Sequence, residues 1–234
     1  MYKHLLLSLI ILLALSIGGQ AHASTIVRAP NASGLVGYWN FDVDAGGTNV
    51  LDLSGQRNDG TMKNMDPATD WVDGKVGSGA MDFDGDSDYV EVDDSSSLQI
   101  TSQLTISAWI KRDVLDSNYR EIVRTGSPYF ISGNGQNEFT LAINNTGYDD
   151  GYAPSGTGEW EHVVGTYNDS TDEIKLYHNG IWKMTNVNTQ TLTTESANFV
   201  MKSPLVLPAQ NVKTKHQPFT LAEFVGPHWR VLSV

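Results

Sequence analysis

Residues Gly79 to Arg112 read GAMDFDGDSDYVEVDDSSSLQITSQLTISAWIKR, which is three apolar runs separated by polar turns. Met81 and Phe83 alternate with aspartates, and the next run alternates in the same way around Val90. The third run places four apolar side chains on one face, Leu104, Ile106, Ala108 and Ile110. Alternation with period two, bounded by Gly, Asp and Ser, is typical of half-buried antiparallel strands.

Short apolar runs continue at roughly ten-residue spacing through most of the chain, without a convincing segment of helical periodicity. The dipeptide Asn179-Gly180 gives the strongest turn signal, because both residues tolerate the positive φ angles of a type I′ hairpin. A two-residue loop there places Tyr177 directly opposite Trp182 as a cross-strand aromatic pair. The sequence therefore predicts an all-β fold, a two-sheet antiparallel β-sandwich or jelly roll.

The chain has a formal net charge of −12 and no cysteine. The acidity argues against nucleic acid and anionic membrane surfaces as partners and would favour divalent cations. The absence of cysteine excludes disulfides, zinc–thiolate sites and cysteine nucleophiles. At the N-terminus, an apolar run follows Lys3 and leads to Ala21-His22-Ala23, the form of a secretory signal peptide that is cleaved after Ala23. A membrane anchor is the alternative, but the run is shorter than the ~20 residues that a span requires.

These observations divide the chain into four parts. We expect a signal peptide over 1–23, a linker over 24–34, one domain over 35–200 and an atypical tail over 201–234. The tail holds four of the eight prolines but only one of the 22 glycines and one of the 27 acidic residues. Two interpretations stay open: a basic tail or linker, and a stretch translated after a frameshift or truncation near Val200.

Six segments resemble the laminin-G-like (LamG-like) jelly-roll domains of the concanavalin A-like lectin/glucanase superfamily. They are GLVGYWNFD (Gly34–Asp42), DLSGQRNDGT (Asp52–Thr61), GKVGSGAMDFDGDSDYVEV (Gly74–Val92), LTISAWIKR (Leu104–Arg112), EWEHVVGTYN (Glu159–Asn168) and IKLYHNG (Ile174–Gly180). The resemblance implies two sheets packed face to face and a terminal strand that pairs near the first strand. No segment like that terminal strand is visible after Val200, so we expect it to be missing and Val36–Phe41 to lie at an open edge.

Two aspartate-rich loops are candidates for calcium. Between Asp82 and Asp94, neither possible register has the glycine that an EF-hand loop requires at its sixth position, so we interpret these aspartates as a polar turn. The loop DLSGQRNDG offers hard oxygen ligands from Asp52, Asn58 and Asp59, and the resemblance implies structural calcium in this region. The alternative is a turn held by hydrogen bonds from Asx side chains.

A catalytic site is not indicated. The sequence contains no G-x-S-x-G, H-E-x-x-H or phosphate-binding glycine loop, and it lacks the paired-acid strand motif of the glucanase relatives. His162 lies between Trp160 and Val164 on a predicted strand, where a structural role is the better explanation.

Candidate binding residues are expected where aromatic rings and polar groups meet on loops. Tyr148 and Tyr152, with Asp149 and Asp150 between them, lie on the long loop Asn145–Gly158, and Trp182 and Tyr129 are further candidates. Core packing is the better explanation for three strand tryptophans, Trp39, Trp109 and Trp160.

The sequence therefore predicts a secreted, non-catalytic module that binds a glycan or an extracellular or cell-surface protein, with structural calcium as a further expectation. It fits a fragment of a larger extracellular protein. Two alternatives stay open: a polysaccharide-active enzyme, hydrolase or lyase, and a structural adhesion domain without a small ligand.

Overall fold

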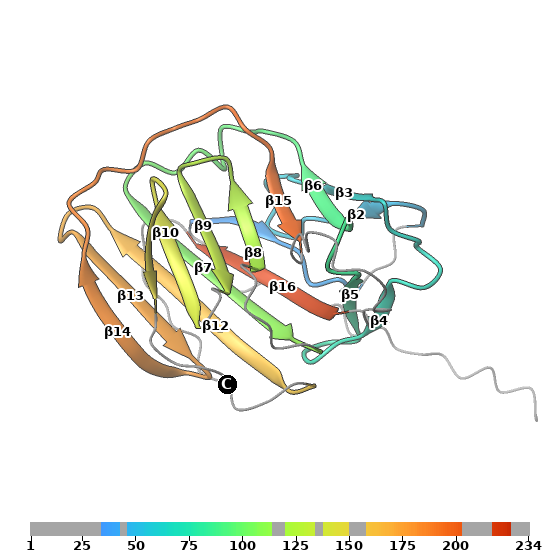
Figure 1. Cartoon of the computed structure of the whole chain (residues 1–234). Helices are drawn as coiled ribbons and strands as arrows, with labels where there is room; N and C mark the ends of the chain where they lie inside the picture. The colour runs from blue at the N-terminus through green and yellow to red at the C-terminus, as the bar shows by residue number, and fades with distance from the viewer. Residues whose placement is uncertain are drawn as a thin grey trace, which may run out of the picture.

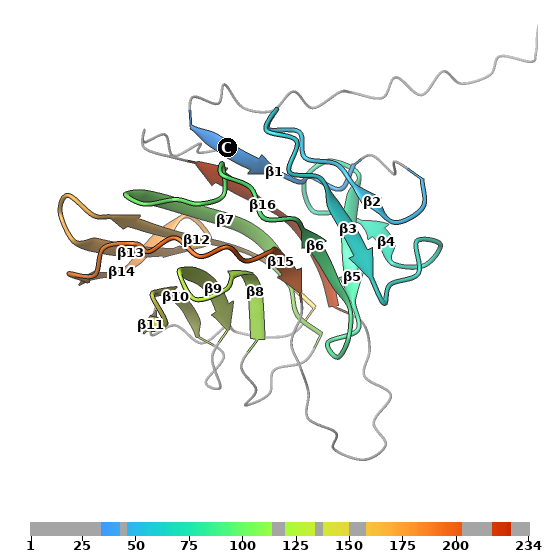
Figure 2. The same cartoon turned by 90° about the horizontal axis from the view of Figure 1, so that it is seen from above.

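The computed structural model describes residues 34–42, 46–113, 120–133, 138–149 and 158–202, together with the backbone of 217–225. These residues form two antiparallel β-sheets that face each other, as Figures 1 and 2 show. The predicted two-sheet sandwich is thus confirmed. The predicted signal peptide and all of the predicted linker except Gly34 lie outside the described residues.

The first sheet has the strand order β14-β13-β12-β7-β16-β5-β4, and β1 pairs with β16 beside this path. Its strands are β1 (Leu35–Tyr38), β4 (Trp71–Asp73), β5 (Gly79–Phe83), β7 (Gln103–Lys111), β12 (Trp160–Asn168), β13 (Glu173–His178), β14 (Ile181–Val187) and β16 (Gln217–Val225).

The second sheet has the order β11-β10-β9-β8-β15-β6-β3-β2. Its strands are β2 (Asn49–Val50), β3 (Gly60–Lys63), β6 (Tyr89–Val92), β8 (Arg120–Thr125), β9 (Tyr129–Gly133), β10 (Phe139–Ile143), β11 (Thr146–Asp149) and β15 (Phe199–Lys202). Residues expected in the long loop after Asn145 thus form β11, which pairs with β10.

The core lies between the sheets, where the inward positions of both meet. Along β7 burial alternates at every residue, and the four predicted core residues from Leu104 to Ile110 are all buried. Trp39 is fully buried, stacks on Phe199 of β15 with ring centroids 5.0 Å apart, and donates a hydrogen bond from Nε1 to the Asn58 carbonyl oxygen. A side chain at Gly37 would clash with the Trp39 ring, because an added Cβ would lie 2.2 Å from it. The core prediction for Trp39 is confirmed.

The expectation of a missing terminal strand was wrong. β16 lies in the tail and pairs antiparallel with β1, β5 and β7, the place that the resemblance assigns to the terminal strand (Figure 2). β1 is therefore paired along one side, with β16, and no second strand pairs with it among the described residues. β15 also passes the expected domain end at Val200, because it runs to Lys202 between β6 and β8. Composition misled the prediction, since a nine-residue strand needs neither glycine nor acidic residues. Whether the tail arose by a frameshift stays untested.

Among the residues that the structure describes, no helix has the length and apolar character of a membrane span.

Candidate functional site

Aromatic side chains gather on the outer face of the first sheet, opposite the core. Trp109 of β7 alternates with the buried Ala108 and Ile110, so its ring points outward. The register pairs Trp109 with His162 of β12, and pairs Tyr177 of β13 with Trp182 of β14. We call Trp109, His162, Tyr177 and Trp182 the aromatic row. Figure 1 shows the four strands that carry it side by side.

The core prediction for Trp109 and Trp160 was therefore wrong. Both are partly exposed, and each lies one residue away from inward positions: Trp109 between Ala108 and Ile110, Trp160 next to the buried Glu161. Burial of Leu104, Ile106 and Ile110 on one face of β7 requires Trp109 to lie on the other. The alternation of apolar residues along this strand was therefore sufficient to predict that Trp109 faces outward.

The Trp109 end of the row is a stacked pair. The rings of Trp109 and His162 lie 5.0 Å apart at an interplanar angle of 28°, and Ser107 Oγ lies 2.8 Å from His162 Nε2. Burial, with a smaller contribution from nearby His178, lowers the pKa of His162 below its ordinary value. The imidazole is therefore neutral at neutral pH, and the structural role expected for His162 agrees with this ring contact.

The other end of the row is fixed by the β13–β14 hairpin. Asn179 and Gly180 have φ angles of 51° and 74°, as a type I′ turn requires, and Tyr177 pairs with Trp182 across it. Both predictions are confirmed. The side chain of Trp182 is held by a 3.0 Å hydrogen bond from its Nε1 to Thr185 Oγ1, although the residue is 59% exposed. A bulge next to Tyr177 adds one residue to β14.

The other predicted binding residues lie elsewhere or outside the described residues. Tyr148 lies on β11 of the second sheet, partly buried against the core, and Asp149 ends the same strand. Asp150 and Tyr152 lie outside the described residues. Tyr129 was a wrong candidate, because its side chain is buried and its hydroxyl donates a hydrogen bond to the Leu98 carbonyl oxygen at 2.8 Å. Of the predicted candidates, the structure places only Trp182 in the row.

The proposed calcium loop, from Asp52 to Asp59, is a hydrogen-bonded turn in this structure. The Asp52 carboxylate accepts hydrogen bonds from the amides of Tyr38, Ser54 and Asn58 and from the Ser54 hydroxyl, at 2.7–2.9 Å. Asp59 Oδ1 accepts the Asp52 amide, and Asn58 Oδ1 accepts the Ser95 hydroxyl. An ionised carboxylate has about four acceptor sites, so these four donors occupy it and a cation would have to displace one of them.

The described residues also contain no group of three His, Cys, Asp or Glu side chains arranged to hold a metal ion. The predicted ligands thus do not fit calcium as arranged here, and the hydrogen-bonded turn fits better. Calcium binding by the chain stays a prediction.

The aspartates after β5 also accept hydrogen bonds from backbone amides of their own turn. Asp84 Oδ1 accepts the amides of Asp86, Ser87 and Asp88, while Asp88 Oδ2 accepts the amide of Asp84. This segment joins β5 to β6, so the interpretation as a polar hairpin turn agrees with the structure.

A buried charged cluster, which the sequence analysis missed, lies on the inner side of the first sheet. Arg112 Nη2 donates to Glu161 Oε2 at 2.8 Å, and His178 Nε2 lies 3.0 Å from Glu161 Oε1. Burial would raise the pKa of Glu161, but hydrogen bonds and charges of His178 and Arg112 outweigh it and lower that pKa. Phe139 of the facing sheet covers the cluster, with its ring 4.8 Å from the guanidinium and 5.0 Å from the imidazole. The sequence contained a signal for this cluster. Glu161 lies two residues from the core residue Val163, and His178 lies two residues from the core residue Leu176, so alternation places both side chains on the inward face.

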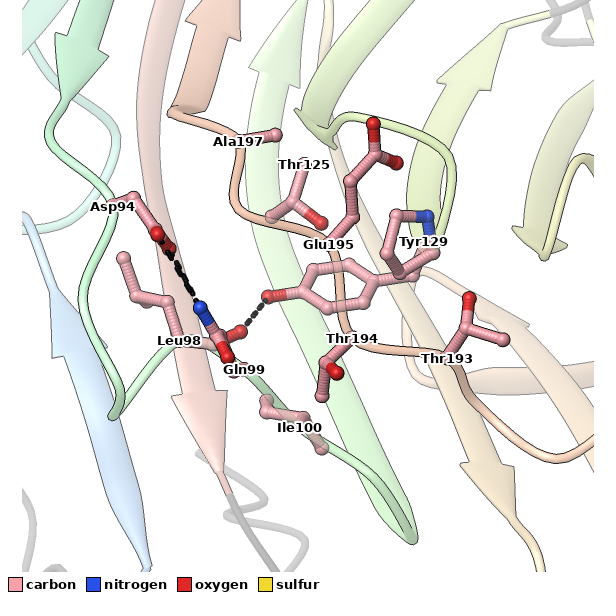
Figure 3. A pocket seen from close by; sticks show the side chains of 11 residues that line it. Asp94, Leu98, Gln99, Ile100, Thr125, Tyr129, Thr193, Thr194, Glu195 and Ala197 are labelled. Atoms are coloured by element: carbon pink, nitrogen blue, oxygen red, sulfur yellow. Dashed lines mark hydrogen bonds between the residues drawn. The ribbon is translucent and has the colours of Figure 1, made fainter.

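A small pocket lies where the connections before β7 and before β15 meet the β8–β9 turn (Figure 3). Gln99 donates to the Asp94 carboxylate, whose pKa is lowered chiefly by the Ser196 hydroxyl. The Ser127 amide donates to Glu195 at 2.8 Å. These contacts join three loops, and the enclosed space is smaller than a sugar ring. We therefore interpret these hydrogen bonds as structural contacts that hold the three loops together, not as a ligand site.

Comparison with known proteins agrees with this architecture. The sequence profile of the family described as Concanavalin A-like lectin/glucanases superfamily matches residues 84–223. The chain belongs to this family. No curated protein matches the sequence.

Solved structures share the fold at low sequence identity. The binding domain of Paraclostridial Mosquitocidal Protein 1 has a TM-score of 0.64 and 15% identity, over 84% of this chain and 50% of that one. A structure of botulinum neurotoxin type C, whose cell entry is described as dependent upon two ganglioside molecules, gives 0.63 and 12%, over 84% and 49%. Domain 4 of AbnA, an extracellular arabinanase from Geobacillus stearothermophilus, in complex with arabinotriose, gives 0.57 and 20%, over 81% and 94%. The chain thus spans about half the length of the toxin chains.

Proposed function

We propose that this protein is a non-catalytic carbohydrate-binding module whose binding surface is the outer face of the first sheet. The aromatic row carries the proposal. Exposed aromatic rings offer flat apolar surfaces to the C–H faces of sugars, and binding sites combine such rings with a few oriented polar groups. Four neighbouring strands at their usual spacing carry the row across about 14 Å, which is long enough for more than one sugar ring.

The exposure of the row supports binding over a purely structural role. Trp182 of the row is 59% exposed, and its neighbour Ile181, which is not part of the row, is 60% exposed. Adjacent exposed apolar side chains are typical of interaction surfaces. The shared fold with Domain 4 of AbnA and with the toxin binding domains agrees with a recognition module, since the former is described with arabinotriose bound.

Hydrolysis at this face has little support. Ser107 and His162 have the spacing of a nucleophile and a base, but both lie inside the β7–β12 ladder. Backbone amides in a ladder are already paired, so they cannot stabilise an oxyanion. Release of reducing sugars or of 4,5-unsaturated products from algal or plant polysaccharides would instead establish the enzymatic alternative.

We also propose that the protein is exported, on the basis of the N-terminal segment up to Ala23. The measurement is N-terminal sequencing of the protein recovered from the medium of a secreting host. A mature chain that begins at Ser24 supports export, while retention of the whole protein inside the cell contradicts it.

The binding experiment uses a glycan array followed by calorimetric titration with the glycans that bind. Trp182→Ala and Tyr177→Ala are compared with Tyr89→Ala, which removes a tyrosine of similar partial exposure from the outer face of the second sheet. We expect both row variants to weaken binding about tenfold or more and the control to bind as the wild type does. Unchanged binding by the row variants would refute this surface. Silence on the array would favour the structural adhesion domain.

A further inference from the structure

Three neighbouring strands of the first sheet differ in charge, at their outward positions, from the chain as a whole. The chain carries a net charge of −12. On the outward positions of β7, β12 and β13, however, Lys111 and Lys175 are the cations and Glu173 is the one acidic residue that the described strands place there. The carboxylate of Glu173 is paired with Lys175 at 2.8 Å. Outward cations therefore outnumber outward carboxylates on these three strands, whereas Asp73 of β4 and Asp82 of β5 add negative charge elsewhere on the sheet.

Two lysines flank the Trp109 end of the row. Lys75, which is exposed, places Nζ 5.9 Å from the centroid of the Trp109 ring. Lys111 lies two residues beyond Trp109 on the same face of β7 and pairs with Trp160 of β12. One cation thus lies over the indole and the second lies along its strand.

The lysine above the indole is held by a fixed turn. Asp42 Oδ1 accepts the amides of Ser78 and Gly79, at 2.6 and 3.0 Å, and anchors the β4–β5 hairpin from which Lys75 extends. The hairpin is also closed by the Gly74 amide, which donates to the Ser78 carbonyl oxygen. These hydrogen bonds therefore fix the backbone of the turn that carries Lys75 next to Trp109.

We propose that the outer face binds an anionic polysaccharide, with sugar rings stacked on the aromatic row and their carboxylates or sulfates paired with Lys75 and Lys111. This inference rests on the proposed function and adds the class of glycan. Because Lys75 Nζ lies beside the Trp109 ring, an anionic group of a sugar bound at this end of the row meets the Lys75 ammonium group, with Lys111 further along the same strand. On an acidic protein, such a local reversal of charge also selects the bound orientation, because the surrounding surface repels a polyanion.

The test compares charged and neutral forms of the same backbone. The probes are polygalacturonate and its fully methyl-esterified form for carboxylates, and carrageenan and agarose for sulfates. Lys75→Gln and Lys111→Gln are measured against Lys63→Gln, which removes the same charge from the second sheet. We expect each row-flanking variant to bind the charged probe about two- to fivefold more weakly, the range of an exposed ion pair. Added salt should weaken the charged complex only.

The outcomes separate this inference from the proposed function. Equal binding of charged and neutral probes, unaffected by Lys75→Gln and Lys111→Gln but weakened by Trp182→Ala, overturns the anionic class and leaves the binding face intact. An equal loss in Lys63→Gln shows non-specific attraction and also overturns it. If Trp182→Ala and Tyr177→Ala bind both the charged and the neutral probes as tightly as the wild type does, the proposed face itself is refuted. Preference for the carboxylate or the sulfate pair identifies which anion the site takes.

Discussion

Replacement of Asp52 by alanine separates a hydrogen-bonded loop from a calcium-stabilised one. The change removes the acceptor of four donors, three of them backbone amides. The Asn58 amide is buried, so leaving it without a partner costs about 1–3 kcal/mol. The amides of Tyr38 and Ser54 are partly exposed and regain water, at about 0.5–1.5 kcal/mol each. We therefore expect the free energy of unfolding to fall by about 2–6 kcal/mol.

The assay is urea unfolding followed by tryptophan fluorescence, in EDTA and in excess calcium. Asp86→Ala, an exposed aspartate in the β5–β6 turn, is the control and should change stability by less than about 0.5 kcal/mol. If hydrogen bonds hold the loop, Asp52→Ala loses the same stability in both buffers and EDTA leaves the wild type unchanged. A loss confined to the calcium buffer, or a wild type that EDTA destabilises, would refute this reasoning and establish a calcium site.

Three further predictions concern other parts of the sandwich. Glu161→Leu removes the carboxylate of Glu161 from the buried Arg112 and should lower the free energy of unfolding by about 3–5 kcal/mol in chemical denaturation. Because the pKa of Glu161 is lowered in the folded state, its contribution is present above the ordinary carboxyl pKa and is lost as pH falls through the folded pKa. If the stability of Glu161→Leu falls with decreasing pH as steeply as that of the wild type, this linkage is contradicted. Gly180→Val forces a β-branched residue to φ 74° and should lower stability by about 1–2 kcal/mol, seen as a lower Tm, while an unchanged Tm would contradict the turn geometry. A chain that ends at Lys202 lacks β16, so β1 loses its partner strand and β5 and β7 each lose one neighbour. This chain should show no cooperative unfolding transition in circular dichroism, whereas a cooperative one would show that the tail is dispensable.

The sandwich was predictable because local signals coincide in it. Alternation around Ile106 identified the inward face of β7, and Asn179-Gly180 defined a hairpin whose register then followed. Each signal depends on residues close together in the sequence, so neither required knowledge of the fold. The terminal strand β16 was missed because its neighbours are distant in sequence and its composition differs from the domain before it.

The binding face was only partly predictable. Trp182 was named as a further candidate, but Trp109 was assigned to the core although its neighbours already occupied the inward face. His162 joins the row only through the cross-strand register of β7 and β12, which a single sequence does not give. The loop at Asp52 was hard to interpret for a different reason. The sequence identifies oxygen atoms that could bind calcium, but it does not reveal which hydrogen-bond donors already contact them.

The most direct test of the proposed binding face is a glycan titration followed by the indole N–H resonances of assigned tryptophans. Trp109 and Trp182 lie on the outer face, whereas Trp39 is fully buried and bonded to the Asn58 carbonyl oxygen, so it serves as an internal control. We predict that the Trp109 and Trp182 signals shift with ligand concentration while the Trp39 signal stays in place. Saturable binding that leaves both outer-face signals unmoved would contradict the account.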